Sequence, residues 1–172
     1  MKKLNFGCGT VILPGWDNVD IQKGKGVSKS FDFDKFPYPL PKNTYDYVLM
    51  NQVIEHLMYP ERALFELRQS CKDGAVMHIE TPHYTNKGAY NSLQHRGFFN
   101  ELAFTNFVNA STLINKNPGF KIKSLKITPT IIGRFFPEFL RSKLSLFING
   151  LHSQIHIDYE IIKEKNDKLN IK

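Results

Sequence analysis

The sequence predicts an α/β domain with a doubly wound, mostly parallel sheet and an antiparallel C-terminal strand. Three patterns support this fold class. Short apolar runs end in glycine or proline turns, an amphipathic segment at 60–71 lies between two apolar runs, and 154–162 alternates apolar and polar residues. A strand–helix–strand unit implies parallel strands joined by a helical crossover. We expect residues 1–172 to form one domain.

The first half of the chain reads as four strands and one helix. Leu4–Phe6 and Trp16–Ile21 predict short buried strands, and Phe31–Phe33 is a possible third. Tyr45–Asn51 is rich in strand formers and nearly continuously apolar, which is typical of a central strand covered on both faces. Pro60–Cys71 predicts an amphipathic helix with proline in its first turn, ended by Asp73-Gly74.

The remaining elements alternate in the same way. Ala75–Glu80 predicts a strand, Asn100–Leu113 a helix, and Phe120–Ile127 a strand near the sheet edge. Phe135–Ile148 is an apolar, basic helix candidate, and Gln154–Ile162 predicts the final strand.

The composition limits the classes of partner. The net charge is +7, but the lysines are scattered, so nucleic-acid binding is not expected. A basic amphipathic helix at 135–148 leaves peripheral membrane contact open, although such a face more often packs on a sheet or covers a site. Two cysteines and no signal peptide or apolar span indicate a reduced, cytoplasmic protein.

A first set of polar residues follows the early strands. Gly7 and Gly9 follow the first strand, and Asp20 ends the second. Glycines allow a ligand to approach the backbone closely, and a carboxylate at the next strand tip can bind both hydroxyls of a ribose. Two glycines after a strand are, on their own, more often only a turn.

Further motifs, which follow the glycine turn in a fixed order along the chain, make this pattern specific for one protein family. Five motifs follow one another along the chain. They are Gly-Cys-Gly-Thr at 7–10, the acidic residue Asp20, Asp-x-x-x-Phe-Pro at 32–37, Tyr-Asp-x-Val at 45–48, and Glu55-His56 before the helix. The stretch Leu4–Pro82 therefore resembles the class I S-adenosylmethionine-dependent methyltransferases of the small type 11 kind. The resemblance implies a Rossmann-like sheet and S-adenosylmethionine as cofactor.

The resemblance also implies roles for individual residues. Asp20 would bind the ribose, and Asp32 would bind the adenine amino group beside Phe33. Asp32 could instead cap the following turn, and Phe33 could be ordinary core. The implied cofactor-binding residues are Gly7, Cys8, Gly9, Asp20, Ile21, Asp32, Phe33, Asn51 and Val53.

The chain departs from the family pattern between its first two strands. Only the short segment of residues 10–17 separates Gly9 from Asn18, whereas a crossover between parallel strands normally needs a dozen or more residues. We therefore expect the first crossover helix to be missing and the connection to be a loop turning at Pro14-Gly15. The form Pro-Gly-Trp-x-Asn-Val-Asp at 14–20 resembles a subgroup often found among enzymes that build surface glycans.

A polar and aromatic segment follows the strand Ala75–Glu80. Ligands of open parallel sheets lie outside the carboxyl ends of the strands, so this segment should cover the reacting group. His95 and His83 are the candidate general bases, because neutral histidine accepts a proton near pH 7. The candidate substrate-binding residues are His56, Tyr84, Tyr90 and Arg96.

Each of these residues has a simpler alternative. His95 and His83, each taken singly, are more often structural residues than catalytic bases, and the same holds for His56 near a helix start. Arg96 could be a surface charge. A metal site formed by His83, His95, His152 and His156 is disfavoured, because residues four apart on a strand are not close neighbours. We therefore expect no metal.

The sequence thus predicts methyl transfer from S-adenosylmethionine to a hydroxyl of a small-molecule, sugar or glycan-precursor acceptor. Transfer to another small molecule or to nitrogen is the nearest enzymatic alternative. A degenerate, non-catalytic cofactor-binding partner subunit is the alternative from another class. The sequence does not determine the oligomeric state.

Overall fold

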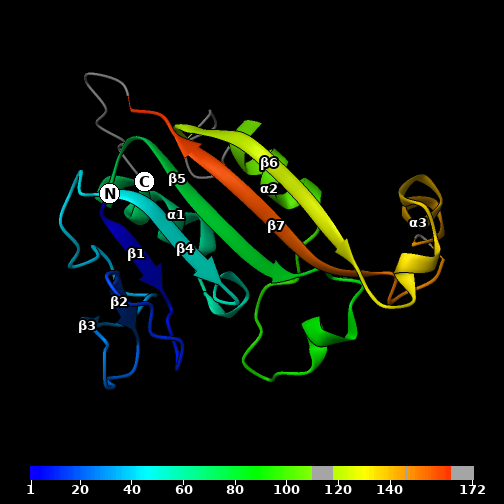
Figure 1. Ribbon diagram of the computed structural model, residues 1–172, viewed down its shortest axis with the longest axis horizontal. Helices are drawn as coiled ribbons and strands as arrows, with labels where there is room; N and C mark the ends of the chain where they lie inside the picture. The colour runs from blue at the N-terminus through cyan, green and yellow to red at the C-terminus, as the bar shows by residue number, and fades with distance from the viewer. Residues whose placement is uncertain (110–117, 146, 164–172) are drawn as a thin grey trace.

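The computed structural model describes residues 1–109, 118–145 and 147–163. These residues form a seven-stranded mixed sheet in the order β3-β2-β1-β4-β5-β7-β6 (Figure 1). The strands are β1 (Lys3–Phe6), β2 (Asp17–Asp20), β3 (Lys29–Ser30), β4 (Tyr45–Asn51), β5 (Cys71–Pro82), β6 (Phe120–Pro129) and β7 (His152–Ile161).

The strand directions confirm the predicted fold class. Strands β3, β2, β1, β4 and β5 pair in parallel. The last strand, β7, lies between β5 and β6 and is antiparallel to both. Strand β6 forms the edge, as its lysine-rich sequence predicts. The fold is thus a Rossmann-like sheet with antiparallel C-terminal strands.

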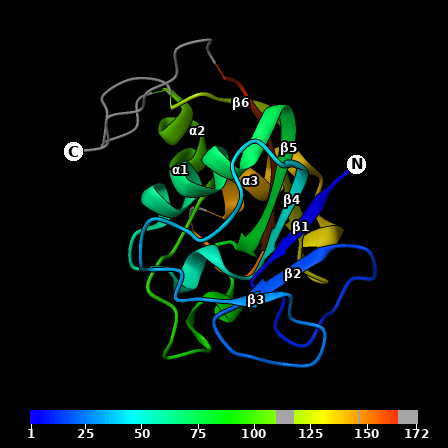
Figure 2. The ribbon, with the colours of Figure 1, turned by 90° about the vertical axis from the view of Figure 1, so that its left-hand side faces the viewer.

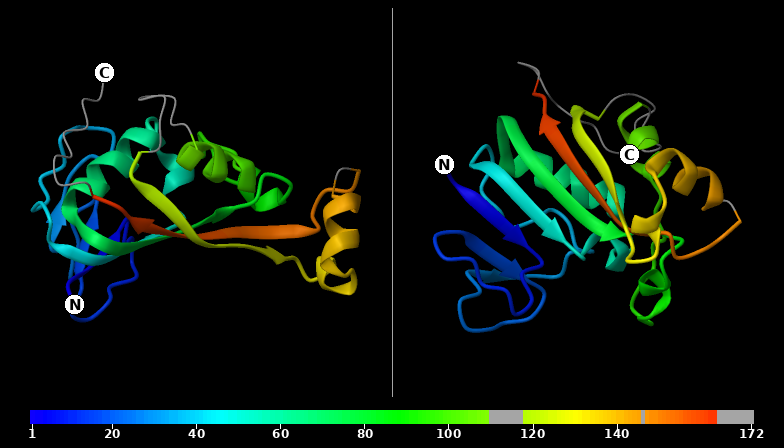
Figure 3. Two further views of the ribbon diagram at one scale, coloured as in Figure 1. Left: turned by 90° about the horizontal axis from the view of Figure 1, so that it is seen from above. Right: turned by 45° about the vertical axis from the view of Figure 1, so that its right-hand side comes forward.

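The helices are α1 (Pro60–Ser70), α2 (Glu101–Asn109) and α3 (Glu138–Leu144), with short 3₁₀ turns η1 (Ile54–His56), η2 (Lys87–Tyr90) and η3 (Gly133–Phe135). Helices α1 and α2 lie over the same face of the sheet, whereas α3 lies beyond the far ends of β6 and β7 (Figure 3). None of these helices has the length and apolarity needed to cross a membrane.

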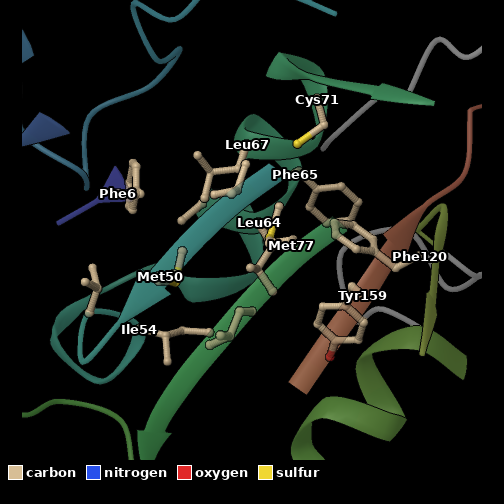
Figure 4. Packing of buried hydrophobic residues seen from close by; sticks show 14 of the residues in the cluster. Phe6, Met50, Ile54, Leu64, Phe65, Leu67, Cys71, Met77, Phe120 and Tyr159 are labelled. Atoms are coloured by element: carbon tan, nitrogen blue, oxygen red, sulfur yellow. The ribbon is translucent and has the colours of Figure 1, made fainter. Parts of the chain in front are cut away.

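The core lies between the sheet and α1. Phe65 and Leu67 of α1 are fully buried against Met50, Met77 and Tyr159 of the strands (Figure 4). Burying an apolar side chain of this size contributes about 1.5–3 kcal/mol, so this face supplies much of the driving force for folding.

The opposite face of the central strands is only half-buried. Strand β4 alternates between fully buried Val48 and Met50 and half-buried Tyr47 and Leu49. The expectation that Tyr45–Asn51 is covered on both faces was therefore wrong, because one face carries the core and the other retains polar neighbours from β5 and β7.

Two predicted boundaries in the first half differ from the structure. The third strand is Lys29–Ser30 and not Phe31–Phe33. The Phe33 ring instead stacks on Phe6, with ring centroids 3.9 Å apart. Helix α1 ends at Ser70, and Asp73-Gly74 lies inside β5, because strand pairing with β4 already begins at Cys71.

The predicted helix at 135–148 is interrupted. The turn η3 ends at Phe135 and α3 begins at Glu138, since Pro137 has no amide hydrogen and holds Phe136 in an extended conformation. The helix predicted for Asn100–Leu113 is found at Glu101–Asn109, and its positions 110–113 lie outside the described residues.

Candidate active site

A cavity of about 690 Å³ opens at the carboxyl ends of the N-terminal strands, and we call it the first cavity. Figure 2 shows β1, β4 and β5 running side by side toward this edge. The cavity brings together seven of the predicted cofactor residues: Gly7, Gly9, Asp20, Ile21, Asp32, Phe33 and Val53. Its other lining residues are Gln22, Asp34 and residues from 52–57 and 93–96.

Gly7 lies where no other residue fits. Its φ is +75°, and a Cβ atom built there would lie 2.3 Å from Cγ2 of Val53. The amides of Gly7 and Cys8 both donate to the Val19 carbonyl oxygen, at 2.9 and 3.0 Å. The first turn is thereby held against the tip of β2, with its backbone at the cavity wall.

Asp20 organises the same wall. Its Oδ2 accepts a 2.7 Å hydrogen bond from the Gly9 amide, and its Oδ1 accepts one of 3.0 Å from the Gln22 amide. The carboxylate thus ties the glycine turn to the end of β2 while it faces the first cavity.

The first crossover contains no helix, as predicted, and residues 7–16 are all described. Two buried asparagines hold this loop in place. Asn18 Oδ1 accepts from the Leu13 amide at 3.0 Å, and its Nδ2 donates to the carbonyls of Leu13 and Trp16. Asn5 Nδ2 donates to the Val11 carbonyl and to Asn18 Oδ1. These bonds replace the internal hydrogen bonds that a helix would supply.

Asp32 and Phe33 each have both positions that the sequence left open: Asp32 caps a turn and Phe33 belongs to the core, while both also lie at the cavity. Asp32 Oδ1 caps the following turn by accepting from the Asp34 amide at 3.0 Å, and Lys35 Nζ lies 3.5 Å from its Oδ2. Phe33 belongs to the hydrophobic core. Both residues nevertheless line the first cavity.

Two predicted cofactor residues lie outside this lining. The Cys8 side chain is buried, and Asn51 is exposed at the end of β4. Gln52, which follows Asn51 and which no sequence motif singled out, lines the cavity instead. Gln52 has a φ of +56°, rare for a residue with a Cβ, and its buried Nε2 has no hydrogen-bond partner. Only the backbone conformation distinguishes it, so no sequence signal was available.

A second cavity of about 250 Å³ adjoins the first one. Gln52 and His56 line both cavities, and His95 and Glu55 line the second. The smaller cavity also has backbone and side chains of β5, η2 and β7 in its wall: Pro82, Asn86, Gly88, Asn91, Ser153 and Gln154.

Glu55 anchors the segment that carries His95. The amides of Arg96 and Gly97 donate to the Glu55 carbonyl oxygen at 2.7 and 3.0 Å. The Glu55 side chain is 1% exposed, and its Oε2 accepts from Thr81 Oγ1 at 3.0 Å. Burial raises the pKa of this carboxyl group. In the sequence, Glu55 is recognisable only as part of the Glu55-His56 motif, and nothing there assigns it to the site.

The six histidines form three ring pairs. His56 contacts His95 with ring centroids 4.7 Å apart. His83 pairs with His152 and His78 with His156, at 4.8 and 6.0 Å. The four histidines considered for one metal ion are therefore divided among three places.

His95 is held in one orientation. Its Nδ1 lies 2.7 Å from the Ala89 carbonyl oxygen, which can only accept. The proton of neutral His95 therefore lies on Nδ1, which leaves Nε2 as an acceptor.

The second candidate base lies elsewhere. His83 is 3% exposed, with Nδ1 2.8 Å from Thr85 Oγ1 and Nε2 3.5 Å from Glu101. It lines neither the first nor the second cavity. Of the two histidines predicted as general bases, His95 thus lines the second cavity, whereas His83 lies apart from both cavities.

The predicted substrate residues are divided in the same way. Tyr84 and Tyr90 line a third cavity of about 1030 Å³ beside Ile131 and Ile132, which shares Asn86 and Ser153 with the second cavity. Arg96 lines the first cavity, where its guanidinium lies 3.9 Å from Asp34. Of the four, only His56 lines the second cavity.

Residues 4–123 match the model of a family described as a methyltransferase domain. The chain belongs to this methyltransferase family. No curated protein matches its sequence.

Solved structures agree on the fold of this methyltransferase. An S-adenosylmethionine-dependent methyltransferase from Archaeoglobus fulgidus is 20% identical, with 92% of this chain and 85% of that chain aligned at a TM-score of 0.62. A second one, from Mesorhizobium loti, is 12% identical over 92% and 90% of the two chains, with a TM-score of 0.60.

The [4+2]-cyclase SpnF is also similar, at 14% identity over 95% of this chain and 75% of that chain, with a TM-score of 0.63. Because one fold carries different reactions, the fold alone does not decide the chemistry. The match to the family model identifies this chain as a class I methyltransferase, with S-adenosylmethionine as its cofactor.

The first cavity fits this cofactor. Its volume of about 690 Å³ lies in the usual range for small-molecule sites of about 300–1,000 Å³. Carboxylates stand beside the ends of two neighbouring strands, and the Gly7 position excludes any side chain from the wall. The bound cofactor supplies a methyl group on a sulfonium, which is ready for displacement by a nucleophile.

Proposed function

We propose that this methyltransferase transfers the methyl group to a hydroxyl of a small-molecule acceptor, such as a sugar or glycan precursor. One observation carries the proposal: the second cavity, lined by His95, shares Gln52 and His56 with the first and so lies beside it. An acceptor in the second cavity would therefore meet a methyl group held in the first. The link to glycans rests on the resemblance of the Pro-Gly-Trp-x-Asn-Val-Asp segment.

The cofactor assignment follows the strand ends. Gly7 and Gly9 would lie under the methionine part, and Asp20 would accept hydrogen bonds from the ribose hydroxyls. Asp32 would accept from the adenine amino group, with the edge of Phe33 beside the ring. Each of these residues lines the first cavity, which supports the assignment.

His95 is the candidate catalytic base. The acceptor oxygen forms a bond to the methyl carbon as the carbon–sulfur bond breaks, and S-adenosylhomocysteine leaves. The hydroxyl proton passes to Nε2 of His95, which the Nδ1 contact with Ala89 leaves free to accept it. Gln52, whose buried Nε2 lacks a partner, is placed to orient the acceptor.

The third cavity supports an acceptor with an apolar or aromatic part. It shares the lining residues Asn86 and Ser153 with the second cavity, and its wall includes Tyr84, Tyr90 and Ile132. A hydroxyl at His95 could thus belong to a molecule whose remainder extends between the two tyrosines.

The far end of the molecule supports a membrane-surface location for this chemistry. Phe135, Phe139 and Phe147 are 82%, 69% and 87% exposed around α3, beside Arg134 and Lys143. Exposed apolar side chains among basic residues suit a surface of anionic lipid.

Two further proposals concern the whole chain. We infer that the described residues fold as one domain, because all seven strands share one sheet. Both cysteines are free and buried, which supports a reducing compartment such as the cytoplasm.

Calorimetry combined with a methylation assay tests the function. We expect S-adenosylmethionine to bind the wild-type protein and a hydroxyl acceptor to become methylated, with His95→Gln retaining cofactor binding but losing turnover by about 100-fold or more. Cofactor binding without methylation of any acceptor would favour a non-catalytic partner subunit. Methylation of nitrogen alone would refute the hydroxyl assignment.

A further inference from the structure

Three side chains at the junction of the first and second cavities have the composition of a metal site. Glu55, His56 and His95 each offer one ligand atom, and these atoms all lie within 4.8 Å of one another. Two imidazoles and one carboxylate are the donors that transition-metal dications such as Zn²⁺ prefer, whereas Mg²⁺ and Ca²⁺ prefer oxygen alone.

The carboxylate gives the strongest indication of a missing partner. Glu55 is 1% exposed, and while its Oε2 accepts from Thr81, its buried Oε1 has no hydrogen-bond partner. A buried carboxylate oxygen without a partner is costly, because burial removes its hydration. A cation bound between this oxygen and the two histidines would compensate for the lost water.

The histidines are oriented as metal ligands usually are. His95 directs Nδ1 to the Ala89 carbonyl at 2.7 Å, and His56 has Nδ1 3.3 Å from the Gln94 carbonyl. A metal-bound histidine typically donates its other ring N–H to a carbonyl or carboxylate, which fixes its orientation. Both Nε2 atoms are then free to bind an ion.

The distances allow closure on one ion. Ligands about 2.1 Å from a single dication lie roughly 3–3.5 Å from one another. The observed spacing of up to 4.8 Å therefore requires only a small inward movement of side chains. The amides of Arg96 and Gly97 bond to the Glu55 carbonyl oxygen, which holds the backbone that carries His95 close to Glu55 and His56.

We propose that Glu55, His56 and His95 bind a transition-metal dication between the two cavities. The inference rests on the proposed function and refines the role of His95. The ion would bind the acceptor oxygen and lower the pKa of its hydroxyl, so that His95 serves as a ligand and the proton leaves to solvent. Glu55, His56 and His95 all line the second cavity, so an acceptor bound there would lie beside the ion.

A second group of the same composition offers an internal control. His78, Glu80 and His156 also lie within 4.8 Å of one another, on the half-buried face of β5 and β7. There His156 already contacts Glu80 at 3.4 Å, and Lys126 is its register partner on β6. A neighbouring lysine opposes cation binding.

Cobalt titration of metal-free protein tests the proposal, because Co²⁺ replaces Zn²⁺ and absorbs visible light when bound. We expect one Co²⁺ per chain, displaced by Zn²⁺, and at least about tenfold weaker binding in both Glu55→Gln and His56→Gln. Glu80→Gln and His156→Gln should bind Co²⁺ as the wild type does. Circular dichroism and thermal melting confirm that each variant is folded.

Two results would overturn the inference: a wild-type protein that binds no Co²⁺ or Zn²⁺, or a loss confined to the Glu80 and His156 variants. Binding of S-adenosylhomocysteine to the metal-free protein separates this failure from failure of the proposed function. Cofactor binding and metal-independent turnover would leave the methyltransferase assignment intact, with His95 as the base.

Discussion

The backbone amide of Gly9 donates a 2.7 Å hydrogen bond to the carboxylate of Asp20. This bond links the turn after β1 to the tip of β2 without an intervening helix. Asp20 thus has two tasks, since it shapes the glycine turn and presents its carboxylate to the first cavity.

Replacement of Asp20 by alanine should weaken cofactor binding. Loss of this half-buried acceptor and of the Gly9 contact costs about 1–3 kcal/mol, which corresponds to roughly 5- to 150-fold in the dissociation constant. Calorimetric titration with S-adenosylhomocysteine measures the change. Asp46→Asn, a carboxylate paired with Lys72 far from the cavity, is the control. An unchanged affinity in Asp20→Ala would refute the ribose assignment.

Gly7→Ala should damage both stability and cofactor binding. The added Cβ would lie 2.3 Å from Val53, at a φ of +75° that side chains rarely adopt. Together the clash and the backbone strain should cost about 2–4 kcal/mol of unfolding free energy. Chemical denaturation measures this loss. The double variant Gly7→Ala/Val53→Ala should recover part of it by removing the clash, and no recovery would mean that backbone strain dominates.

Asn18→Ala should destabilise the loop that replaces the crossover helix. The variant removes the bonds of the Asn18 side chain to the Leu13 amide and to the Trp16 carbonyl, and leaves the Leu13 carbonyl only its bond from the Trp16 amide, at a cost of about 1–3 kcal/mol. Thermal unfolding should show a lower Tm. Asn51→Ala, on an exposed residue, should leave the Tm unchanged. Equal melting temperatures for the two variants would contradict the proposed role of Asn18.

Stability should fall in mild acid because of a buried histidine pair. Burial lowers the pKa of both His83 and His152 below the ordinary value of 6.5. The unfolded chain therefore takes up protons first, so this stability is present above pH 6.5 and is lost as pH falls toward the folded pKa values. The slope should reach up to about 1.4 kcal/mol per pH unit for each histidine.

Urea denaturation between pH 5 and pH 8 measures this dependence. His152→Phe removes one of the two titrating groups, along with a buried Nδ1 that has no partner. Its unfolding free energy should therefore vary less with pH than that of the wild type. The same slope in both proteins would show that other groups control acid sensitivity.

Membrane binding should depend on the apolar residues around α3. Phe135→Ser/Phe139→Ser should reduce sedimentation with vesicles of phosphatidylcholine and phosphatidylserine by about tenfold or more, because each buried ring contributes about 1.5–3 kcal/mol. Leu93→Ser removes an equally exposed apolar side chain near the first cavity and should have no effect. Wild-type protein that stays in the supernatant would end the membrane proposal.

Much of the N-terminal half could be predicted from the sequence. The boundaries of β4 match Tyr45–Asn51, and Gly7, Asp20 and Asp32 line one cavity as expected. The reason is general: parallel strands place their carboxyl ends at one edge, so residues that follow successive strands must converge. The proline at the start of α1 and the short first crossover are equally local signals.

The positions after β5 could not be predicted in the same way. His83 and His95 follow the same strand, yet one is buried beside Glu101 and the other contacts His56. Tyr84 and Tyr90 line the third cavity and not the second. These outcomes depend on loop hydrogen bonds between residues that are distant in the chain.

The sequence by itself therefore determined the succession of strands and helices along the chain, the glycine turn, the missing helix and the acidic strand tips. Only the tertiary structure decided that Gln52 lies at the junction of two cavities and that Glu55 and His95 meet there. The physical reason is that backbone periodicity and turn chemistry act over a few residues. The meeting of Glu55 and His95 instead requires Arg96 and Gly97 to bond to a carbonyl on another loop.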